Sequence, residues 1–217
     1  MGIAERKERE KAQKREFLID VAEEIFFEKG YEAATMDQIA AKAEYSKGTL
    51  YLYFKNKEEL YIAISTRSVD LFQKIVNDEM QKSVTGAEKL AAIKNSYLRF
   101  FLEAPEHMKV MLHAFRSPTV LASLQENQET MQAIMQKDQE LNQLIASAII
   151  QSAQEGTLKS RSGKKFDEKE AMTMVLAGGI ILNGIFQQVF DMMSFWEEHI
   201  PISQEEAIRN SFELLNF

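Results

Sequence analysis

The stretch TMDQIAAKAEYSKGTLYLYFKNKEEL, residues 35–60, decides the fold prediction. Its pattern predicts two short helices, 36–43 and 47–54, joined by a connection of only three residues. Such a connection is the geometry of a helix-turn-helix, which places its second helix in the major groove of DNA. Spacing alone is equally consistent with a helical hairpin that serves only packing, so the side chains have to separate the two interpretations.

The second of these helices divides cleanly into apolar and polar positions. Leu50 and Phe54, four residues apart, are expected to face the bundle. Ser46 can cap the helix. The first turn then contains the cation of Lys47, the small residue Gly48 and the hydroxyl of Thr49. Polar groups at this end of a groove-binding helix meet base edges and phosphates. The predicted DNA-binding residues are Thr35, Ser46, Lys47, Gly48, Thr49, Tyr51, Tyr53, Lys55 and Lys57.

The whole chain is predicted to be helical. Strand patterns do not recur, and helix starts carry capping pairs in which an N-cap residue precedes Glu or Gln by three positions. These pairs are Thr35 with Gln38, Asn56 with Glu59, and Ser203 with Glu206. The predicted helices are 12–29 (ended by Gly30 with a positive φ), 36–43, 47–54, 56–81, 87–103, 106–115, 119–136, 138–155, 168–193 and 203–216, with a loop over 156–165.

The sequence therefore predicts an all-α protein of two domains. Residues 1–60 form a three-helix DNA-binding domain that includes a basic arm over residues 1–15. Residues 61–217 form a larger helical bundle for ligand binding and dimerisation.

At this point residues 15–61 resemble the DNA-binding domain of the tetracycline-repressor (TetR) family of regulators. The matching positions are Gly30-Tyr31, Thr35, Ile39-Ala40, Ala43, Ser46 through Phe54, and Lys57-Glu58-Glu59-Leu60. The resemblance implies a homodimeric, cytoplasmic bacterial regulator that binds a pseudo-palindromic operator in double-stranded DNA. It also implies a small-molecule effector in the larger domain, whose binding moves the two recognition helices out of register with the operator.

The resemblance also assigns roles to single residues. It implies that Lys47, Gly48, Thr49 and Tyr51 belong to the recognition helix, and that Thr35, Tyr53 and Lys57 contact phosphates. Two positions depart from the family pattern, which usually has Gly at position 44 and a small aliphatic residue at position 45, where this chain has Glu44 and Tyr45. If position 44 is left-handed, Glu there costs about 1 kcal/mol relative to Gly. Its carboxylate would also weaken nearby phosphate contacts.

The formal net charge of −7 is unfavourable for DNA binding, because an acidic protein is repelled by a polyanion. The cations are concentrated, however. Residues 1–15 hold six basic and three acidic side chains and residues 42–57 hold four and one, so each stretch carries +3. Charges are screened beyond about 8–10 Å at ordinary salt, so the local potential at the contact surface decides binding. The acidic remainder predicts modest nonspecific affinity.

Two segments lack charge altogether, 141–154 over 14 positions and 171–190 over 20. A monomer's helix normally has one charged face, so these second faces are expected to meet another copy in a symmetric homodimer. A deep central helix in a larger monomer is the open alternative. The longer segment has the length of a membrane span, but Asn183 and Gln187 argue against one. The predicted interface residues are Leu141, Leu144, Ile145, Ala148, Ile149, Ala177, Ile181, Gly184 and Gln188.

The C-terminal domain is rich in Met and Phe, and Met is common on adaptable binding surfaces. Most of these side chains are expected to be plain core, and a cavity for an apolar or amphipathic ligand is a hypothesis. The candidate pocket residues are Tyr97, Phe101, Met111, His113, Phe115, Arg116, Met135, Asn183, Phe186 and Gln187.

No catalytic, metal or cofactor site is predicted. The absence of cysteine excludes disulfides, thiolate metal sites and cysteine nucleophiles. The three histidines, His107, His113 and His199, lack metal-ligand spacing, and neither a nucleophile elbow nor a phosphate-binding glycine loop occurs. The N-terminus has no apolar stretch of signal-peptide length. We therefore expect a protein that is not an enzyme, needs no cofactor and is not bound to a membrane.

Three functional interpretations stay open. The first is a ligand-responsive transcription regulator, predicted to be a repressor. The second is a DNA-binding regulator that responds to a protein partner or to no effector. The third is a helical small-molecule-binding dimer whose DNA function has lapsed, an interpretation that only Glu44 favours.

Overall fold

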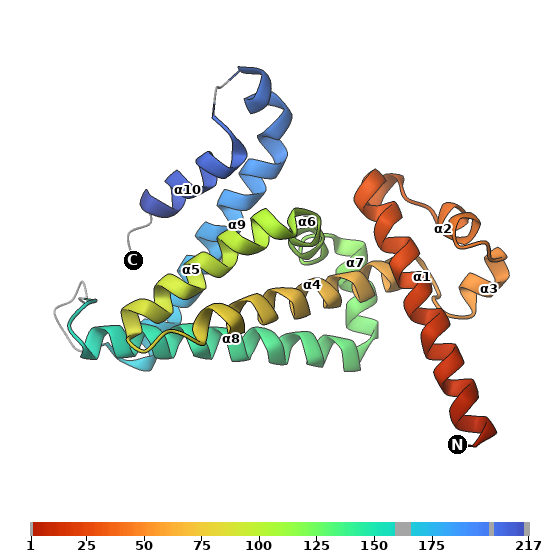
Figure 1. The fold of residues 1–217 in the computed structure, drawn as a ribbon, viewed down its shortest axis with the longest axis horizontal. Coiled ribbons are helices and arrows are strands. Elements are labelled where there is room, and N and C mark those ends of the chain that lie inside the picture. The colour runs from red at the N-terminus through yellow and green to blue at the C-terminus, as the bar shows by residue number, and fades with distance from the viewer. Residues whose placement is uncertain (1, 159–165, 200–201, 215–217) are drawn as a thin grey trace. The chain divides into compact units, whose positions relative to one another are not determined.

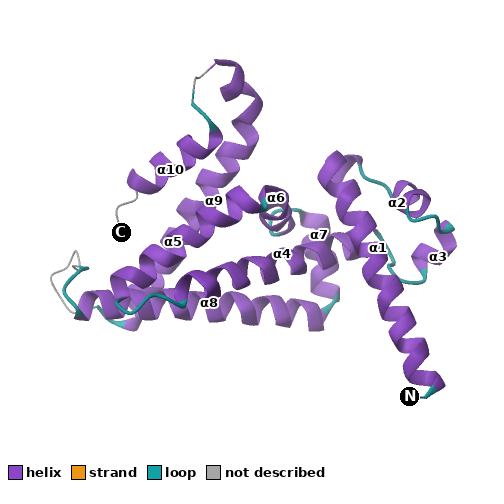
Figure 2. Ribbon diagram, viewed as in Figure 1, coloured by secondary structure: helices purple, strands orange, loops and turns teal. Residues whose placement is uncertain are grey.

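The chain is α-helical throughout the residues that the computed structural model describes, 2–158, 166–199 and 202–214 (Figures 1 and 2). The helices are α1 (Ile3–Ala33), α2 (Met36–Lys42), α3 (Lys47–Tyr51), α4 (Lys57–Met80), α5 (Gly86–Glu103), α6 (Pro105–Ala114), α7 (Pro118–Glu126), α8 (Gln128–Gln154), α9 (Glu168–His199) and α10 (Gln204–Leu214). These ranges contain no strand, so the all-α prediction is confirmed. Of the predicted loop 156–165, residues 159–165 lie outside the described ranges.

Several predicted helix limits are wrong. α3 ends at Tyr51 and not at residue 54, and α9 continues to His199 and not only to residue 193. α1 begins at Ile3 and not at residue 12, because its Lys, Arg, Glu, Ala and Gln side chains have high helix propensity without an apolar stripe. α8 runs unbroken through Lys137, where a break was expected. The chain breaks instead at Asn127, whose Oδ1 accepts a hydrogen bond of 3.1 Å from the Thr130 N–H and thereby caps α8.

The chain forms two compact units. The first consists of Met1–Ser68 with His113–Met131, and the second of Val69–Leu112 with Gln132–Phe217. Their limits differ from the predicted domain limits at residues 60 and 61, because the start of α4 and all of α7 join the N-terminal helices. The assignment of DNA binding to one domain and ligand binding to the other stays a prediction.

The first unit has one apolar core built from α1 to α4. Its innermost side chains are each 5% exposed or less: Leu18, Ala22, Ile25, Phe26, Ile39, Leu50, Phe54, Leu60 and Ile64. The predicted positive φ at Gly30 is present, at 76°, a conformation that residues with a Cβ resist. One further helical turn then carries α1 to Ala33.

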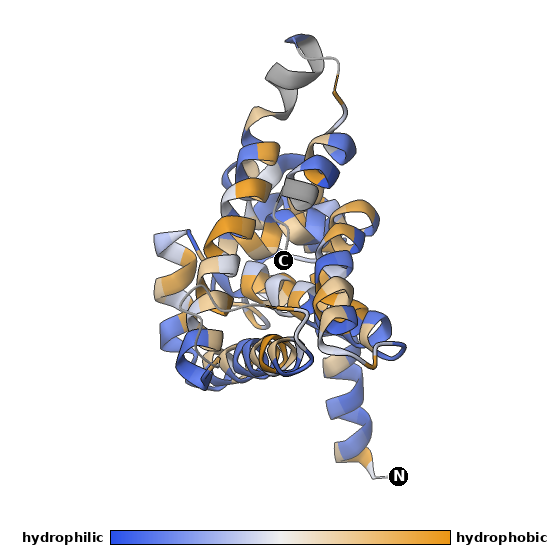
Figure 3. Ribbon diagram, turned by 90° about the vertical axis from the view of Figure 1, so that its left-hand side faces the viewer, coloured by the Kyte–Doolittle hydropathy of each residue, from blue (hydrophilic) through white to orange (hydrophobic). Residues whose placement is uncertain are grey.

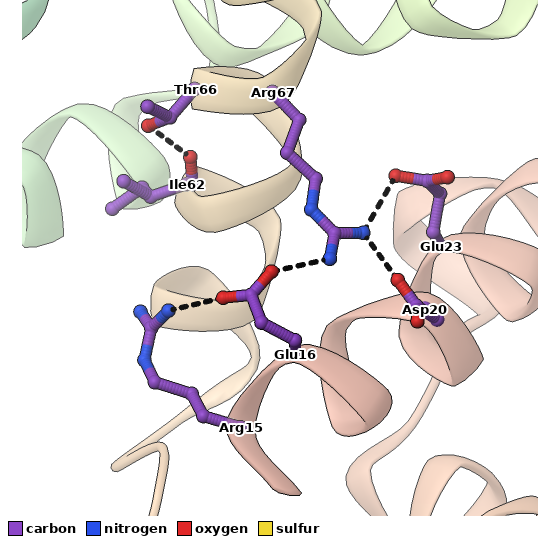
Figure 4. A network of polar contacts seen from close by, with 7 residues as sticks. All are labelled: Arg15, Glu16, Asp20, Glu23, Ile62, Thr66 and Arg67. Carbon is purple, nitrogen blue, oxygen red and sulfur yellow. Dashed lines mark hydrogen bonds and ion pairs between the residues drawn. The ribbon is translucent and has the colours of Figure 1, made fainter. Parts of the chain in front are cut away.

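An ion-pair network fastens α1 to α4 (Figure 4). The Arg67 guanidinium of α4 lies 2.7 Å from a Glu16 oxygen, 2.8 Å from Asp20 and 3.5 Å from Glu23. Glu16 in turn lies 3.6 Å from Arg15. A single exposed ion pair contributes little, but several carboxylates around one guanidinium form a network that holds two helices in register.

The second unit contains an aromatic core, which we define as Phe72, Ile75, Val76, Phe100, Phe101, Met108, Leu112, Phe186, Val189 and Ile208. The Phe72 and Phe100 ring centroids lie 5.2 Å apart, and those of Phe101 and Phe186 lie 5.9 Å apart. Gly86 marks a close helix contact, because a Cβ there would lie 2.1 Å from the backbone nitrogen of Ser152. A side chain at position 86 would therefore push α5 away from α8.

Candidate nucleic-acid interface

α2 starts at a reciprocal cap. The Gln38 N–H donates to Thr35 Oγ1 and the Thr35 N–H donates to Gln38 Oε1, both over 3.2 Å. This is the predicted capping box, and it satisfies two of the N–H groups that a helix start leaves without partners. Thr35 is exposed, and its hydroxyl keeps its own hydrogen for donation. The predicted role of Thr35 as a phosphate contact is compatible with this geometry.

The connection between α2 and α3 turns sharply at Glu44, which has a φ of 58°. This residue is therefore left-handed, so the cost expected for a residue with a Cβ applies. The neighbouring Tyr45 packs edge-on against Phe17 of α1, with ring centroids 6.2 Å apart. A large residue is thus accommodated where a small aliphatic one was expected.

α3 presents one face to the core and another to solvent. Ser46 Oγ accepts a hydrogen bond of 3.0 Å from the Thr49 N–H and lies 2.8 Å from the Thr49 hydroxyl, so the predicted cap is present. Leu50 is 0% exposed, as predicted for a core position. Tyr51 is 43% exposed and Leu52 is 80% exposed. The solvent face of α3 is therefore available to a partner.

Gly48 is exposed on this face. A Cβ added there would meet only Ser46 Oγ, at the ordinary contact distance of 3.8 Å. The fold therefore does not require glycine at position 48. A missing side chain on an exposed recognition face suits the close approach of a second backbone, such as that of DNA.

The cations of this surface are already paired with carboxylates. Lys47 Nζ lies 2.6 Å from Asp37 Oδ1 of α2, and this hydrogen bond raises the pKa of Lys47. Lys55 Nζ lies 3.6 Å from Glu59, whose other oxygen accepts a hydrogen bond of 2.7 Å from the Lys55 N–H. The Glu59 N–H donates to Asn56 Oδ1 over 2.9 Å, which confirms the third predicted cap.

Lys57 is held in a different way. Its ammonium donates a hydrogen bond of 2.8 Å to the Tyr31 carbonyl oxygen and lies 4.2 Å from the centroid of the Tyr31 ring. The side chain is half-buried. Lys57 therefore stabilises the junction of α1 and α4, and a phosphate contact would have to share this ammonium.

Tyr31 also ties the start of α7 to the first unit. Its hydroxyl donates to Glu58 over 2.6 Å and lies 3.3 Å from Thr119 Oγ1. Burial, together with the bond to Glu58, raises the pKa of Tyr31 to about 12. The His113 ring lies 4.9 Å from Tyr31 and 5.3 Å from Tyr61, and burial lowers the pKa of His113.

The predicted pocket residues divide between the two units. Tyr97, Phe101, Met111 and Phe186 lie in or against the aromatic core of the second unit. His113, Phe115 and Arg116 belong to the first unit. Met135 and Asn183 are exposed, and the Gln187 amide donates to Asp191 over 2.7 Å. A shallow hollow lies at the start of α9, and it is lined by none of these candidates but by Asp167, Glu168, Lys169, Met172, Thr173 and Leu176.

The predicted interface residues divide between the two helices. Ala177, Ile181, Gly184 and Gln188 lie on one exposed face of α9. On α8, by contrast, Ala148 is 0% and Ile149 is 4% exposed, and Leu141, Leu144 and Ile145 are half-buried. Ala148 and Ile149 pack inside their own chain, so this part of the predicted interface is corrected. The charge-free pattern of α8 is explained in part by burial within the protomer.

α9 also raises the question of a membrane. Residues Glu168–Met192 are long and apolar enough to cross a membrane by length and composition, and 17% of the most apolar window is buried. The helix of a soluble protein can have the same length and composition.

Sequence reasoning missed two features of the surface. Asp37 was not singled out, because nothing in the local pattern shows that it lies beside Lys47. The exposure of Leu52 was missed as well, since an apolar residue close to a buried position is normally expected to be buried too. Its phase on the helix, two residues after the buried Leu50, was the available signal.

Known proteins resemble both parts of this chain. Residues 18–64 match the family model described as bacterial regulatory proteins, tetR family. The chain is 34% identical over 90 residues to the fatty acid metabolism regulator protein of Bacillus subtilis (strain 168), a match that covers 42% of this chain and 45% of that protein. It is 27% identical over 201 residues to the uncharacterized HTH-type transcriptional regulator YhgD of the same organism, covering 93% of each.

A solved structure shows the same fold over almost the full length. The crystal structure of AibR in complex with isovaleryl coenzyme A and operator DNA superimposes with a TM-score of 0.64 at 19% identity, covering 92% of this chain and 96% of that one. Together with the matching helix-turn-helix, these findings confirm the resemblance to TetR-family regulators: residues 18–64 match the DNA-binding domain of that family, and the chain shares its fold with AibR over almost its full length.

Proposed function

We propose that this chain is a regulator of the TetR family, a sequence-specific repressor that leaves its operator when a small amphipathic molecule binds to its larger domain. The observation that carries the proposal is the capped, solvent-facing α3, with Leu50 buried and its polar face open. Lys47, Gly48, Thr49 and Tyr51 would read base edges in the major groove. Thr35, Tyr53, Lys55 and Lys57 would hold phosphates and so fix the position of α3.

The operator is proposed to be pseudo-palindromic and to be bound by a homodimer. The exposed face of α9 supports this, because Leu176 is 58% and Ile180 is 74% exposed although both are apolar. An added Cβ at Gly184 would meet nothing within 4 Å, so a second helix can approach closely there. A two-fold dimer presents two identical recognition helices, which match an inverted repeat in the DNA.

The effector is proposed to be an acyl-coenzyme A. The aromatic core of the second unit is packed with apolar side chains, with Met111 and Tyr97 at its edge, so a ligand that entered between these helices would meet apolar groups. AibR was crystallised with isovaleryl coenzyme A, and the Bacillus relative is named for fatty acid metabolism. Such a thioester combines an apolar chain with a charged head, in keeping with the amphipathic ligand expected from the sequence. The protein would then act in the cytoplasm, where this metabolite occurs.

Fluorescence anisotropy on labelled duplexes tests both halves of the proposal. The duplexes would tile the promoter region beside the chain's own gene. We expect one duplex to bind in preference to the others, and an acyl-coenzyme A to release it at a concentration at which free coenzyme A does not. A series of acyl chains from short to long would locate the optimum.

The outcomes separate the open interpretations. If no duplex binds while a thermal-shift assay detects acyl-coenzyme A, the chain is a small-molecule-binding dimer without DNA function. If a duplex binds and no acyl-coenzyme A releases it, the DNA-binding part of the proposal stands and the effector part is wrong.

A further inference from the structure

The first turns of α1 extend beyond the core of the first unit. Every residue from Gly2 to Phe17 is exposed, and burial begins at Leu18. Figure 1 shows this end of the helix continuing past α2 and α3, and Figure 3 shows that it is almost entirely hydrophilic. At 1.5 Å per residue, residues 3–15 form a rod of about 20 Å. We call residues 3–15 the extension.

The extension carries six basic and three acidic side chains. Arg6 lies 3.4 Å from Glu10, so this pair is largely neutral. Lys7, Lys11 and Lys14, by contrast, have no ion-pair partner among the described residues. The positive charge of the extension therefore resides largely in three exposed ammonium groups that form no ion pair with a described carboxylate.

These three lysines share one face of the helix. Their spacing of four and then three residues places them in line. The same spacing continues through Leu18, Ala22 and Ile25, which are 0%, 0% and 5% exposed and face the bundle. The basic stripe of the extension is thus the continuation of the buried stripe of α1, and it points to the side of α1 on which the other helices of the unit lie.

A contact at the base of the extension identifies that side. The Arg15 guanidinium lies 4.9 Å from the centroid of the Phe54 ring, and Phe54 follows α3 by three residues. Arg15 borders the stripe on one side, and Phe17, whose ring packs against Tyr45 just before α3, borders it on the other. The stripe between them therefore faces the side of α1 that carries the recognition helix. By helical phase, in contrast, Arg9 lies on the opposite face and Arg6 lies to the side of the stripe.

We propose that the extension is a second DNA-contact surface, which binds the phosphates of the duplex beside the site read by α3. This inference rests on the proposed function. Charge complementarity and continuity with the α3 surface support DNA as the occupant, since duplex DNA carries one negative charge for roughly every 1.7 Å of axis. The ammonium groups of the stripe bind without first losing a carboxylate of the chain.

The test uses the full chain and two charge-matched double variants. Lys7→Gln with Lys11→Gln removes two charges from the stripe, and Arg6→Gln with Arg9→Gln removes two from outside it. Gln keeps helix propensity close to that of Lys and Arg, and circular dichroism confirms that each variant folds. Anisotropy on a duplex that carries the preferred sequence and long flanks would be measured from low to physiological salt.

For the stripe variant we expect the slope of log affinity against log salt to become shallower by about 1.8 per chain, because each lost phosphate contact removes roughly 0.9. Affinity near physiological salt should fall about tenfold or more, and the variant outside the stripe should lose less than about a third of that. Equal losses in the two variants would overturn the proposal, since they would show an unspecific effect of net charge.

Two further outcomes also contradict it. If the parental chain binds the duplex and the stripe variant has the same slope, the extension does not touch DNA although the proposed function stands. If the parental chain binds no DNA, the proposed function and this inference fail together. Sedimentation with phosphatidylglycerol vesicles provides the last arm: loss of vesicle binding in the stripe variant, with DNA binding unchanged, would assign the surface to membranes.

Discussion

The helix-turn-helix and the extension of α1 both carry lysines, but only the first pairs them within the chain. Lys47 lies 2.6 Å from Asp37, and Lys55 lies 3.6 Å from Glu59. In the extension, Lys7 and Lys11 have no such partner among the described residues. In the proposed complex, DNA would have to displace a carboxylate at α3, whereas along the extension it would meet lysines that have no ion-pair partner. Under this proposal α3 would contribute discrimination between sequences and the extension would contribute attraction.

This proposed division would allow a chain with a net charge of −7 to bind a polyanion. Part of the acidic excess is gathered around Arg67, where Glu16, Asp20 and Glu23 surround one guanidinium between α1 and α4 (Figure 4). These carboxylates are at least partly neutralised, and screening weakens what remains beyond about 10 Å.

The largest expected effect is on stability, and it tests which side of α3 faces the core and which faces solvent. Leu50→Ala should lower the free energy of unfolding by about 2–5 kcal/mol, because it removes a fully buried side chain from the core of the first unit. Leu52→Ala, at an 80% exposed position, should change it by less than about 0.5 kcal/mol. Urea unfolding followed by circular dichroism measures both, and equal losses would contradict the orientation of α3.

The next prediction concerns Lys55 and Lys57, which the sequence analysis assigns to the same role but which the structure places in different surroundings. Lys57→Gln should destabilise the fold by about 1–2 kcal/mol, since it removes a charged hydrogen bond and a cation–π contact with Tyr31. Lys55→Gln should leave stability almost unchanged, because that ion pair is exposed. Both should weaken DNA binding similarly for all sequences. If Lys55→Gln proves the more destabilising of the two in thermal unfolding, the Lys57 ammonium does not stabilise the junction of α1 and α4.

A third prediction concerns the left-handed residue in the turn. Glu44→Gly should stabilise the chain by about 1 kcal/mol, because glycine adopts a φ of 58° without the steric cost of a Cβ. It also removes a carboxylate from the connection between α2 and α3, so that this surface, like the extension, has fewer carboxylates close to its lysines. The rise should appear as a higher urea midpoint, and Glu44→Ala serves as the control, which loses the charge and keeps the strain. A midpoint that rises equally in both variants would mean that charge and not backbone strain was relieved.

The smallest effect tests the pairing directly. Asp37→Asn keeps the shape of the side chain but frees Lys47, so affinity for duplex DNA should rise about two- to fivefold. The gain should be similar for matched and scrambled sequences, because it removes competition and adds no base contact. Competition anisotropy with both duplexes provides the measurement. A loss of affinity would instead show that Asp37 itself contacts the DNA.

Local features of the helix-turn-helix could be predicted from the sequence, whereas contacts between residues distant in sequence could not. The caps at Thr35 and Ser46 follow from residues three positions apart, so the sequence reveals them. The pairing of Asp37 with Lys47 depends on how α2 crosses α3, and the sequence pattern contains no signal for it. The same holds for the pocket candidates, where aromatic composition predicted a cluster but could not separate His113, which joins the first unit, from Tyr97, which joins the second.

Helix limits show the same distinction. The apolar stripe of α1 begins at Leu18, so periodicity could not predict a helix that continues to Ile3 on propensity alone. On α9 the face that was predicted to meet a second copy is exposed in the single chain, and its pairing stays a prediction. On α8 the same signal reflected burial in part, as Ala148 shows.

The central claim is that α3 reads the sequence of double-stranded DNA, and site selection from a random duplex library tests it most directly. The full chain and its Lys47→Gln, Thr49→Ala double variant would each be taken through the same rounds, and the enriched pools sequenced. We predict an inverted repeat for the parental chain and altered or lost preference at defined base pairs for the variant. The same preferred sequence from both chains, or no enrichment with the parental chain, would contradict the claim.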